Sequence, residues 1–318
     1  MHINTTNSTM VTYFIINGIS DHAELQVLIF LLVLLIYLIT LGGNMTILLL
    51  VCLDRHLHTP MYFFLGNLSI LDMSSTTVTL HKILANFISG NKTISFNACM
   101  TQVYIFASLT GQELLILTAM GYDRYVAICN PLRYHMVMNH TTCALLATAC
   151  WMFGFLQVIP PVVILSRFSC YTSNEINHFF CDMVPLMRLS CSDTSLLQLL
   201  NLTEGLILST MTPFCLTFTS YVFIILTITK IPSIAGRRKA FYTCSSHLTV
   251  VIFLYIILAC QYVTPPSTSS VEVNKLFSLF NTAAIPLLNP LIYSLKNKDV
   301  KSALRRRLRW FKHIKQIG

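Results

Sequence analysis

Charged residues are scarce in this sequence. Asp, Glu, Lys and Arg make up 10% of its 318 residues, whereas soluble globular domains carry roughly 25%. Hydrophobic residues make up 54%. A soluble fold could not cover its surface with so few charges. The composition therefore argues against a soluble domain and favours a chain that the lipid bilayer solvates.

The sequence also lacks the patterns that would indicate an enzyme or a transporter. It has no zinc-protease motif and no nucleophile and base at convincing spacing, so we expect no enzymatic activity. It has no internal repeat of the kind that transporters often carry. A transporter or channel is the main alternative among membrane proteins, and substrate flux in vesicles would support it.

Seven apolar runs account for most of the chain. They lie at about 24–52, 60–86, 97–129, 141–165, 197–229, 239–262 and 272–294. A helix that spans a bilayer needs about 20 apolar residues, and each run is long enough. The sequence therefore predicts an all-α membrane protein, a seven-transmembrane helix bundle. We expect a tail at 1–23, the bundle at 24–294, and an amphipathic helix and tail at 295–318.

The positions of the basic residues predict the orientation. The net charge of +9 is concentrated on one side of the runs, at Arg55, Arg124, Arg133, Lys230, Arg237, Arg238, Lys239 and the C-terminal group. The other side holds Lys82, Lys92, Arg167, Arg188 and Lys275. This asymmetry follows the positive-inside rule and does not resemble a nucleic-acid-binding stripe. We therefore expect an extracellular N-terminus, a cytoplasmic C-terminus and no nucleic-acid partner.

The N-terminal tail carries two glycosylation sequons. Asn4-Thr5-Thr6 and Asn7-Ser8-Thr9 both match the acceptor pattern, which agrees with an extracellular tail. The tail is polar, and the first apolar run is too long for the apolar region of a cleaved signal peptide. We expect glycosylation at Asn4 and Asn7 and no cleavable signal peptide.

The C-terminal segment has the pattern of a basic amphipathic helix. Its apolar residues recur at helical spacing, at Val300, Leu304, Leu308, Phe311 and Ile314. Its basic residues project elsewhere, at Arg305, Arg306, Arg309, Lys312 and Lys315. The pattern favours a helix that lies on the cytoplasmic membrane face and contacts lipids, over a solvated basic tail.

Polar residues inside the apolar runs are candidates for a functional site, because ionisable groups are costly there. Asp72 and Glu113 lie in the middle of the second and third runs, and Asn44 and Asn289 lie in the first and seventh. If the bundle brings them together, the two carboxylates would share a proton or a cation. One interpretation is a sodium- or proton-linked switch, and the other is a hydrogen-bond network that only fixes how the helices align.

Four of the eleven cysteines lie in segments predicted outside the cell: Cys99, Cys170, Cys181 and Cys191. Four cysteines allow three pairings, and the sequence does not choose among them. His178 and Cys181 could also be metal ligands, but a cysteine in a disulfide supplies no thiolate. We therefore predict no metal site.

Several segments together resemble one family's signatures. They are Leu57–Leu65 (LHTPMYFFL), Met120–Leu132 (MGYDRYVAICNPL), Ser220-Tyr221, Lys239–Leu248 (KAFYTCSSHL) and Pro286–Leu295 (PLLNPLIYSL). In this order they resemble the odorant receptors, which are rhodopsin-like (class A) G-protein-coupled receptors. Gly121 and Tyr242 depart from the family pattern, where alanine and serine are usual.

The resemblance implies a function and partners. The chain would bind small-molecule odorants and activate a heterotrimeric G protein of the stimulatory olfactory type, raising cyclic AMP. It would lie in the plasma membrane, in olfactory neuron cilia. A non-olfactory class A chemoreceptor is the alternative.

The resemblance also implies residue roles. It implies the disulfides Cys99–Cys181 and Cys170–Cys191, and it favours the switch interpretation of Asp72 and Glu113, with a sodium ion as the candidate cofactor. It places the coupling switch at Asp123, Arg124, Tyr125, Tyr221, His247 and Tyr293.

The ligand pocket should be apolar with a few polar anchors. Helical spacing counted back from Arg124 gives the residues of the third run that should face the interior of the bundle. With the inward residues of the later runs, the candidates are Phe106, Ala107, Thr110, Gly111, Gly205, Ser209, Tyr255, Leu258, Ala259, Tyr262 and Thr282. None of them is acidic, so we expect that the ligand is not an amine held by a salt bridge.

Overall fold

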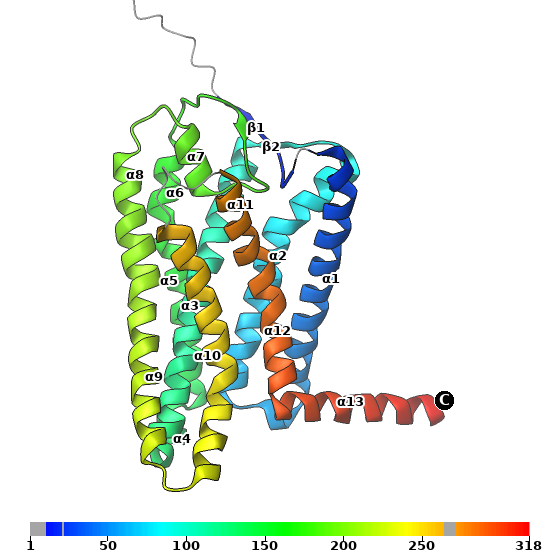
Figure 1. The fold of residues 1–318 in the computed structure, drawn as a ribbon, viewed down its shortest axis with the longest axis vertical. Coiled ribbons are helices and arrows are strands. Elements are labelled where there is room, and N and C mark those ends of the chain that lie inside the picture. The colour runs from blue at the N-terminus through cyan, green and yellow to red at the C-terminus, as the bar shows by residue number, and fades with distance from the viewer. Residues whose placement is uncertain (1–10, 21, 264–270, 318) are drawn as a thin grey trace, which may run out of the picture.

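The computed structural model describes residues 11–20, 22–263 and 271–317. Long helices stand side by side, with a small sheet at one end of the bundle and one helix lying across the other end (Figure 1). These two ends are called the sheet end and the α13 end below.

Seven rods form the bundle. They are α1 (Ala23–Leu53), α2 (Pro60–Ser89), α3 (Phe96–Cys129), α5 with α6 (His140–Gln157 and Ile159–Ser166), α8 with η3 and α9 (Ser195–Leu200, Asn201–Met211 and Thr212–Lys230), α10 (Ile234–Val263), and α11 with η4 and α12 (Val271–Leu279, Phe280–Ala284 and Ile285–Lys296). Their bounds lie within a few residues of the seven predicted apolar runs, so the predicted bundle is confirmed.

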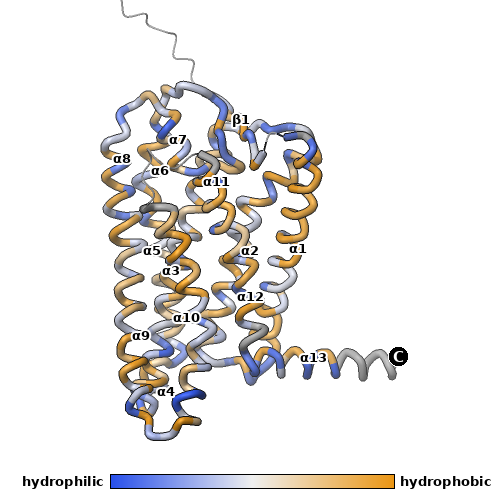
Figure 2. The backbone as a smooth tube through the Cα atoms, in the orientation of Figure 1, coloured by the Kyte–Doolittle hydropathy of each residue, from blue (hydrophilic) through white to orange (hydrophobic). Residues whose placement is uncertain are grey.

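Six of these rods are long and apolar enough to cross a membrane, among the described residues. The remaining rod, α2, has 30 residues but carries many polar ones. It packs against both α1 and α3, so polar residues such as Asp72 and Thr76 are buried between neighbours. The lipid-facing surface is instead supplied by rods such as α1, where Leu28 and Leu31 are exposed. Figure 2 shows hydrophobic residues along the rods and hydrophilic residues concentrated at both ends.

Short elements complete the fold. At the sheet end these are β1 (Tyr13–Ile16), β2 (Thr93–Ser95), β3 (Glu175–Ile176) and α7 (Met183–Leu189). At the other end they are η1 (Arg55–Leu57), η2 (Pro131–Arg133), α4 (Tyr134–Val137) and α13 (Lys298–Ile317).

The sheet has the order β2-β1-β3, with β1 antiparallel to β2 and parallel to β3. It joins the N-terminal segment to the α2–α3 connection and to the long loop after α6. Phe14 and Ile16 of β1 are buried beneath it. The sequence did not predict this sheet, because strands of two to four residues are too short to show a periodicity.

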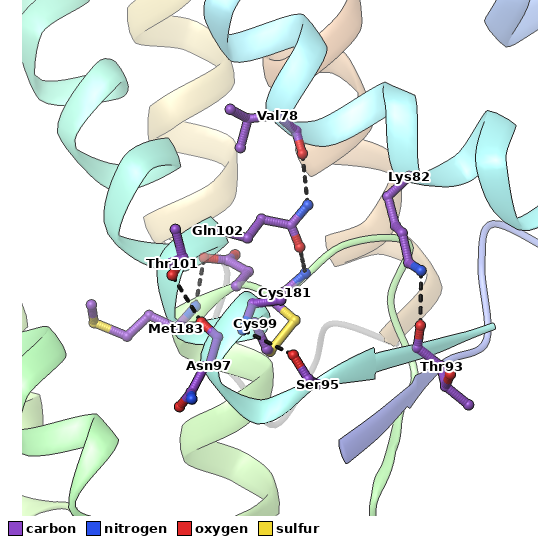
Figure 3. Close-up of a disulfide and its surroundings, with 12 residues drawn as sticks. Val78, Lys82, Thr93, Ser95, Asn97, Cys99, Thr101, Gln102, Cys181 and Met183 are labelled. Atoms are coloured by element: carbon purple, nitrogen blue, oxygen red, sulfur yellow. Dashed lines mark hydrogen bonds between the residues drawn. A yellow bond between two sulfur atoms is a disulfide. The ribbon is translucent and has the colours of Figure 1, made fainter. Parts of the chain in front are cut away.

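Two disulfides among the described residues constrain the long loop after α6, one by bonding it to the bundle and one by closing a segment within the loop. Cys99, near the start of α3, is bonded to Cys181, and Cys170 is bonded to Cys191. These are the pairings that the resemblance implied. Gln102 reinforces the first of them: its Nε2 donates to the Val78 carbonyl (2.6 Å), and its Oε1 accepts from the Cys181 amide (2.9 Å) (Figure 3). The loop is therefore fixed to both α2 and α3.

The side chains next to Cys181 form a plug at the sheet end. His178, Phe179 and Phe180 are all buried, and the Phe180 ring packs edge-on against Phe106 of α3 at 4.9 Å. Burial, with a smaller contribution from the charge of Lys275, lowers the pKa of His178 to about 4. His178 is therefore neutral at physiological pH, as its apolar surroundings require.

Close packing of α3 against α5 depends on Gly154. A Cβ at this position would collide with Gln112 Cγ and lie 3.0 Å from the carbonyl oxygen of Ser108. We expect Gly154→Ala to destabilise the protein by about 1–3 kcal/mol, because the backbone of α3 cannot yield as a side chain can. Thermal unfolding in detergent, followed with a thiol-reactive dye, measures this through the buried thiols of Cys143 and Cys150.

Gly42→Ala is the matched control. Gly42 also lies inside a spanning helix, but a Cβ there meets nothing within 4 Å. Its melting temperature should stay at the wild-type value or rise, since alanine favours a helix over glycine. Equal melting temperatures for the two variants would contradict the close contact at Gly154.

Candidate functional site

The third rod ends in a buried ion pair at the α13 end. Arg124 donates to the Asp123 carboxylate through Nε (2.9 Å) and through a second, shorter contact from Nη2. The other carboxylate oxygen accepts from the Tyr134 hydroxyl at 2.7 Å. Asp123 is fully buried and Arg124 nearly so. The carboxylate therefore holds the arginine within the bundle and ties α3 to α4.

A second set of contacts joins three rods close to this pair. The Nε2 of His247 lies 2.9 Å from the Leu117 carbonyl, which can only accept, so Nε2 carries the hydrogen. In the neutral ring Nδ1 is then the acceptor, and the Tyr221 hydroxyl donates to it at 2.7 Å. This chain of bonds connects α9, α10 and α3.

The departure at Gly121 is not explained by these neighbours, which leave room for a larger residue. A Cβ there would lie 3.5 Å from Thr217 and 3.6 Å from His247, which is ordinary van der Waals contact. The alanine that is usual at this position would therefore fit. The other departure, Tyr242, is exposed, and its ring lies 5.9 Å from the Lys298 ammonium.

Two of the predicted switch residues, Tyr125 and Tyr293, take part in neither of these sets of hydrogen bonds. Tyr293 is fully buried, and within the described part of the chain its hydroxyl has no hydrogen-bond partner. Tyr125 is half-buried, with its ring 6.0 Å from that of Phe223. The six residues are thus divided between the ion pair, the three-rod contact and two aromatic side chains nearby.

The mid-bundle polar residues are all buried, but they form two groups. Asn289 donates from Nδ2 to both carboxylate oxygens of Asp72, at 3.0 and 3.1 Å. Glu113 lies close enough for its charge to interact with that of Asp72. One carboxylate oxygen of Glu113 and the amide oxygen of Asn289 have no hydrogen-bond partner among the described residues. Oxygen atoms of this kind are the ligands that a hard cation prefers, so these residues fit a sodium ion.

Asn44 has a different partner from the one expected. Its Nδ2 donates to the Pro286 carbonyl at 3.1 Å. Pro290 stands four residues later and has no N–H, so that carbonyl has lost its helical partner. Gly43 allows the approach, since a Cβ there would lie 3.0 Å from the Pro290 ring. The Asn44 side chain therefore supplies the hydrogen bond that this carbonyl of α12 lacks.

Helix α13 is attached to the α1–α2 connection. Arg306 donates to Asp54 from Nε (3.0 Å) and Nη2 (2.7 Å), and Tyr62 donates to Asn297 and Asp299 at 3.0 Å. Burial alone would raise the pKa of Asp54, but hydrogen bonds from Arg306 and His56 lower it to about 2. The carboxylate is therefore charged at physiological pH, and the ion pair is complete.

The predicted pocket residues lie in the half of the bundle near the sheet. Gly111 of α3 and Ser209 of η3 approach each other, but a side chain of α5 stands between them. The Ser209 hydroxyl donates to Gln157 Oε1, and a Cβ at Gly111 would collide with Gln157 Nε2. Gln157 therefore occupies the space that sequence reasoning assigned to a ligand.

The other pocket candidates differ in surroundings. Thr282 and Leu258 are buried, and Thr282 donates to the Ser278 carbonyl of its own rod. A Cβ at Gly205 would meet nothing, and Ala259 is exposed. The remaining candidates with described side chains are half-buried, namely Phe106, Ala107, Thr110 and Tyr255. The side chain of Tyr262 lies outside the described residues, as do Asn4 and Asn7.

Two residues near this pocket were missed, Gln157 and Glu204. One carboxylate oxygen of Glu204 in η3 is buried, and no described group hydrogen-bonds to it. The rule that selected Asp72, an ionisable residue inside an apolar run, would have selected Glu204 as well. The expectation that no amine is bound by a salt bridge therefore loses its basis.

Two π-helical stretches, η3 and η4, interrupt the rods that they belong to. Each ends within two residues of a proline, Pro213 or Pro286, and proline disturbs the turn that precedes it. Along η3, side-chain hydroxyls donate hydrogen bonds to the backbone carbonyls five residues earlier. The donors are Ser209, Thr210 and Thr212. Such π stretches are frequent at functional sites.

The fold and these sites define a seven-helix membrane receptor. Squid rhodopsin has the same fold, with a TM-score of 0.72 and 18% identity, covering 88% of this chain and 80% of that one. Residues 33–310 match the olfactory receptor family. Human olfactory receptor 6C3 is 44% identical over 94% of this chain and 96% of its own length, and mouse olfactory receptor 5M5 is 46% identical over 93% of each.

The chain belongs to the olfactory receptor family. It is therefore an odorant-sensing G-protein-coupled receptor and not an enzyme, with a small-molecule ligand and a G-protein partner. It is a multi-pass protein of the plasma membrane.

Proposed function

We propose that this receptor binds small, mostly apolar odorants in the half of the bundle near the sheet and activates a stimulatory, olfactory-type G protein, raising cyclic AMP. The observation that carries the proposal is the buried Asp123–Arg124 pair at the α13 end. A charged pair held by one hydroxyl from α4 can be opened by a partner that competes for the arginine. The test is a cyclic AMP reporter screen against an odorant panel, with the stimulatory G protein present or deleted.

The orientation and cellular site form part of the same proposal. The sheet end would be extracellular and the α13 end cytoplasmic, which agrees with the excess of basic residues at the α13 end, including Arg133, Arg237 and Arg306. Asn4 and Asn7 would then be glycosylated, and α13 would contact membrane lipids. Expression in olfactory neuron cilia follows from the family's role in olfaction.

A sodium ion at the mid-bundle cluster is a further part of the proposal. Glu113 and Asn289 each supply an oxygen with no hydrogen-bond partner among the described residues, and a cation there would neutralise the carboxylates of Asp72 and Glu113. Because it would bind one packing of the bundle better than the other, sodium should shift odorant potency.

We expect replacement of N-methylglucamine by sodium to shift the odorant concentration for half-maximal nucleotide exchange by about fivefold in wild-type membranes. Asp72→Asn should abolish this shift, because it removes the charge while keeping the shape. Asp193→Asn, an exposed loop carboxylate, should keep the wild-type shift. An unchanged sodium dependence in Asp72→Asn would refute the site.

A further inference from the structure

Gln157 is a polar side chain of α5 that lies between two other rods in the half of the bundle near the sheet. Its Oε1 accepts a hydrogen bond from the Ser209 hydroxyl of η3. Its Nε2 lies against Gly111 of α3, where a Cβ would collide with it. One side chain therefore contacts both rods that the sequence predicts to line the pocket.

The backbone of α5 near Gln157 is bonded to α3. The Tyr104 hydroxyl donates to the Phe155 carbonyl at 3.2 Å. The Gln112 side chain donates from Nε2 to the Trp151 carbonyl, also at 3.2 Å. Because these bonds hold α5 in place, a shorter residue at 157 should leave a cavity between the rods and not a collapsed gap.

The Ser209 hydroxyl would keep a hydrogen-bond partner if the Gln157 amide were removed. It also donates to the Glu204 carbonyl, five residues earlier in η3, at 2.6 Å. A buried hydroxyl without a partner destabilises a fold, and that penalty does not arise here. Gln157 can therefore be shortened in a receptor that still folds, which makes its role testable.

We propose that Gln157 is a specificity-determining residue of the odorant pocket and sets an upper limit on ligand size. Its side chain fills the space between α3 and η3. An odorant bound beside the half-buried Phe106 and Thr110 of α3 therefore cannot extend into that space. The inference rests on the proposed function, because it takes this half of the bundle as the odorant site.

Gln157→Ala should extend the range of active odorants toward longer chains. It removes the amide and one methylene, and a cavity left by such a truncation can bind part of a small ligand. Each additional methylene that enters the cavity should raise potency about fourfold. The measurement is the cyclic AMP response to straight-chain aldehydes from butanal to decanal, normalised to surface receptor.

Gln157→Met is the matched control. Methionine is unbranched and similar in length to glutamine but has no amide, so it keeps the volume and loses the hydrogen bond. We expect this variant to keep the chain-length preference of the wild type. An equal shift in the alanine and methionine variants would overturn the proposal, because the amide and not its volume would then set the preference.

A second measurement needs neither an odorant nor a G protein. Ser209→Cys places a thiol beside Gln157, and the full-length receptor in lipid nanodiscs is treated with alkyl methanethiosulfonates from methyl to hexyl. The thiolate attacks the sulfur that carries the alkyl group and forms a mixed disulfide. Methanesulfinate leaves with the electron pair of the broken S–S bond. Mass spectrometry at the level of single residues measures the adduct at position 209.

With Gln157 present, the labelling rate should fall at least fivefold from the methyl to the butyl reagent. In the Gln157→Ala background the two reagents should react at similar rates, whereas Gln157→Met should behave like the wild type. The same profile in all three backgrounds, including no labelling in any of them, would overturn the size limit.

The two measurements also separate this inference from the proposed function. If odorants activate the wild type and Gln157→Ala leaves their chain-length preference unchanged, the inference fails and the proposed function stands. If the reagent profile shifts as expected but no odorant raises cyclic AMP, the proposed function fails and the size limit at Gln157 stands.

Discussion

Arg124→Ala should abolish the odorant-evoked cyclic AMP response while the receptor still reaches the cell surface. The arginine is held in the bundle by the buried Asp123 carboxylate, and we propose that the G protein engages this end of α3. Without the guanidinium, the partner has no cation to bind. The measurement is a cyclic AMP reporter response, normalised to surface receptor detected through an N-terminal tag.

A control is needed because the variant leaves Asp123 buried with only Tyr134 as a partner, and breaking a buried ion pair typically costs about 3–5 kcal/mol. Arg124→Lys keeps the charge but loses the paired contacts of the planar group, so we expect an intermediate response. A variant with normal surface levels and an unchanged odorant response would contradict the role of Arg124 in coupling.

Loss of the Cys99–Cys181 disulfide should remove most of the receptor from the cell surface. The bond closes a separation of 82 residues and anchors the buried plug of His178, Phe179 and Phe180. Removing such a disulfide typically costs about 2–5 kcal/mol, with more lost for longer loops. The double variant Cys99→Ser/Cys181→Ser, which leaves no unpaired thiol behind, should be measured by surface staining against total receptor.

The second disulfide provides the matched comparison. Cys170 and Cys191 are only 21 residues apart and lie nearer the surface, so their double serine variant should lose less surface receptor. If both double variants reached the surface equally well, the proposed anchoring of the plug by Cys181 would be wrong.

The candidate site was only partly predictable, and the acidic residues show why. Asp72 and Glu113 could be selected from the sequence because a charge in an apolar run is costly wherever the helix lies. Their partners could not be selected, because helical periodicity tells which residues share a face but not which neighbour that face meets. Asn44 was expected beside Asp72, yet it bonds to the carbonyl that Pro290 leaves free.

The pocket illustrates the same limit. Gly111 and Ser209 were predicted to line the pocket, but Gln157, from a rod that contributed no candidate, lies against both of them. Sequence spacing could not reveal this, because the reach of a glutamine into a glycine gap depends on how closely α3 and α5 pack.

The sequence by itself determined the seven rods, the amphipathic C-terminal helix and the family. Long apolar runs can be satisfied in a bilayer only by helices, which close their hydrogen bonds within each segment. The tertiary structure alone decided the sheet at one end, the plug beneath it and the partners of the polar residues. Those features depend on contacts between rods, and such contacts arise from the rotation and spacing of helices that a single sequence does not specify.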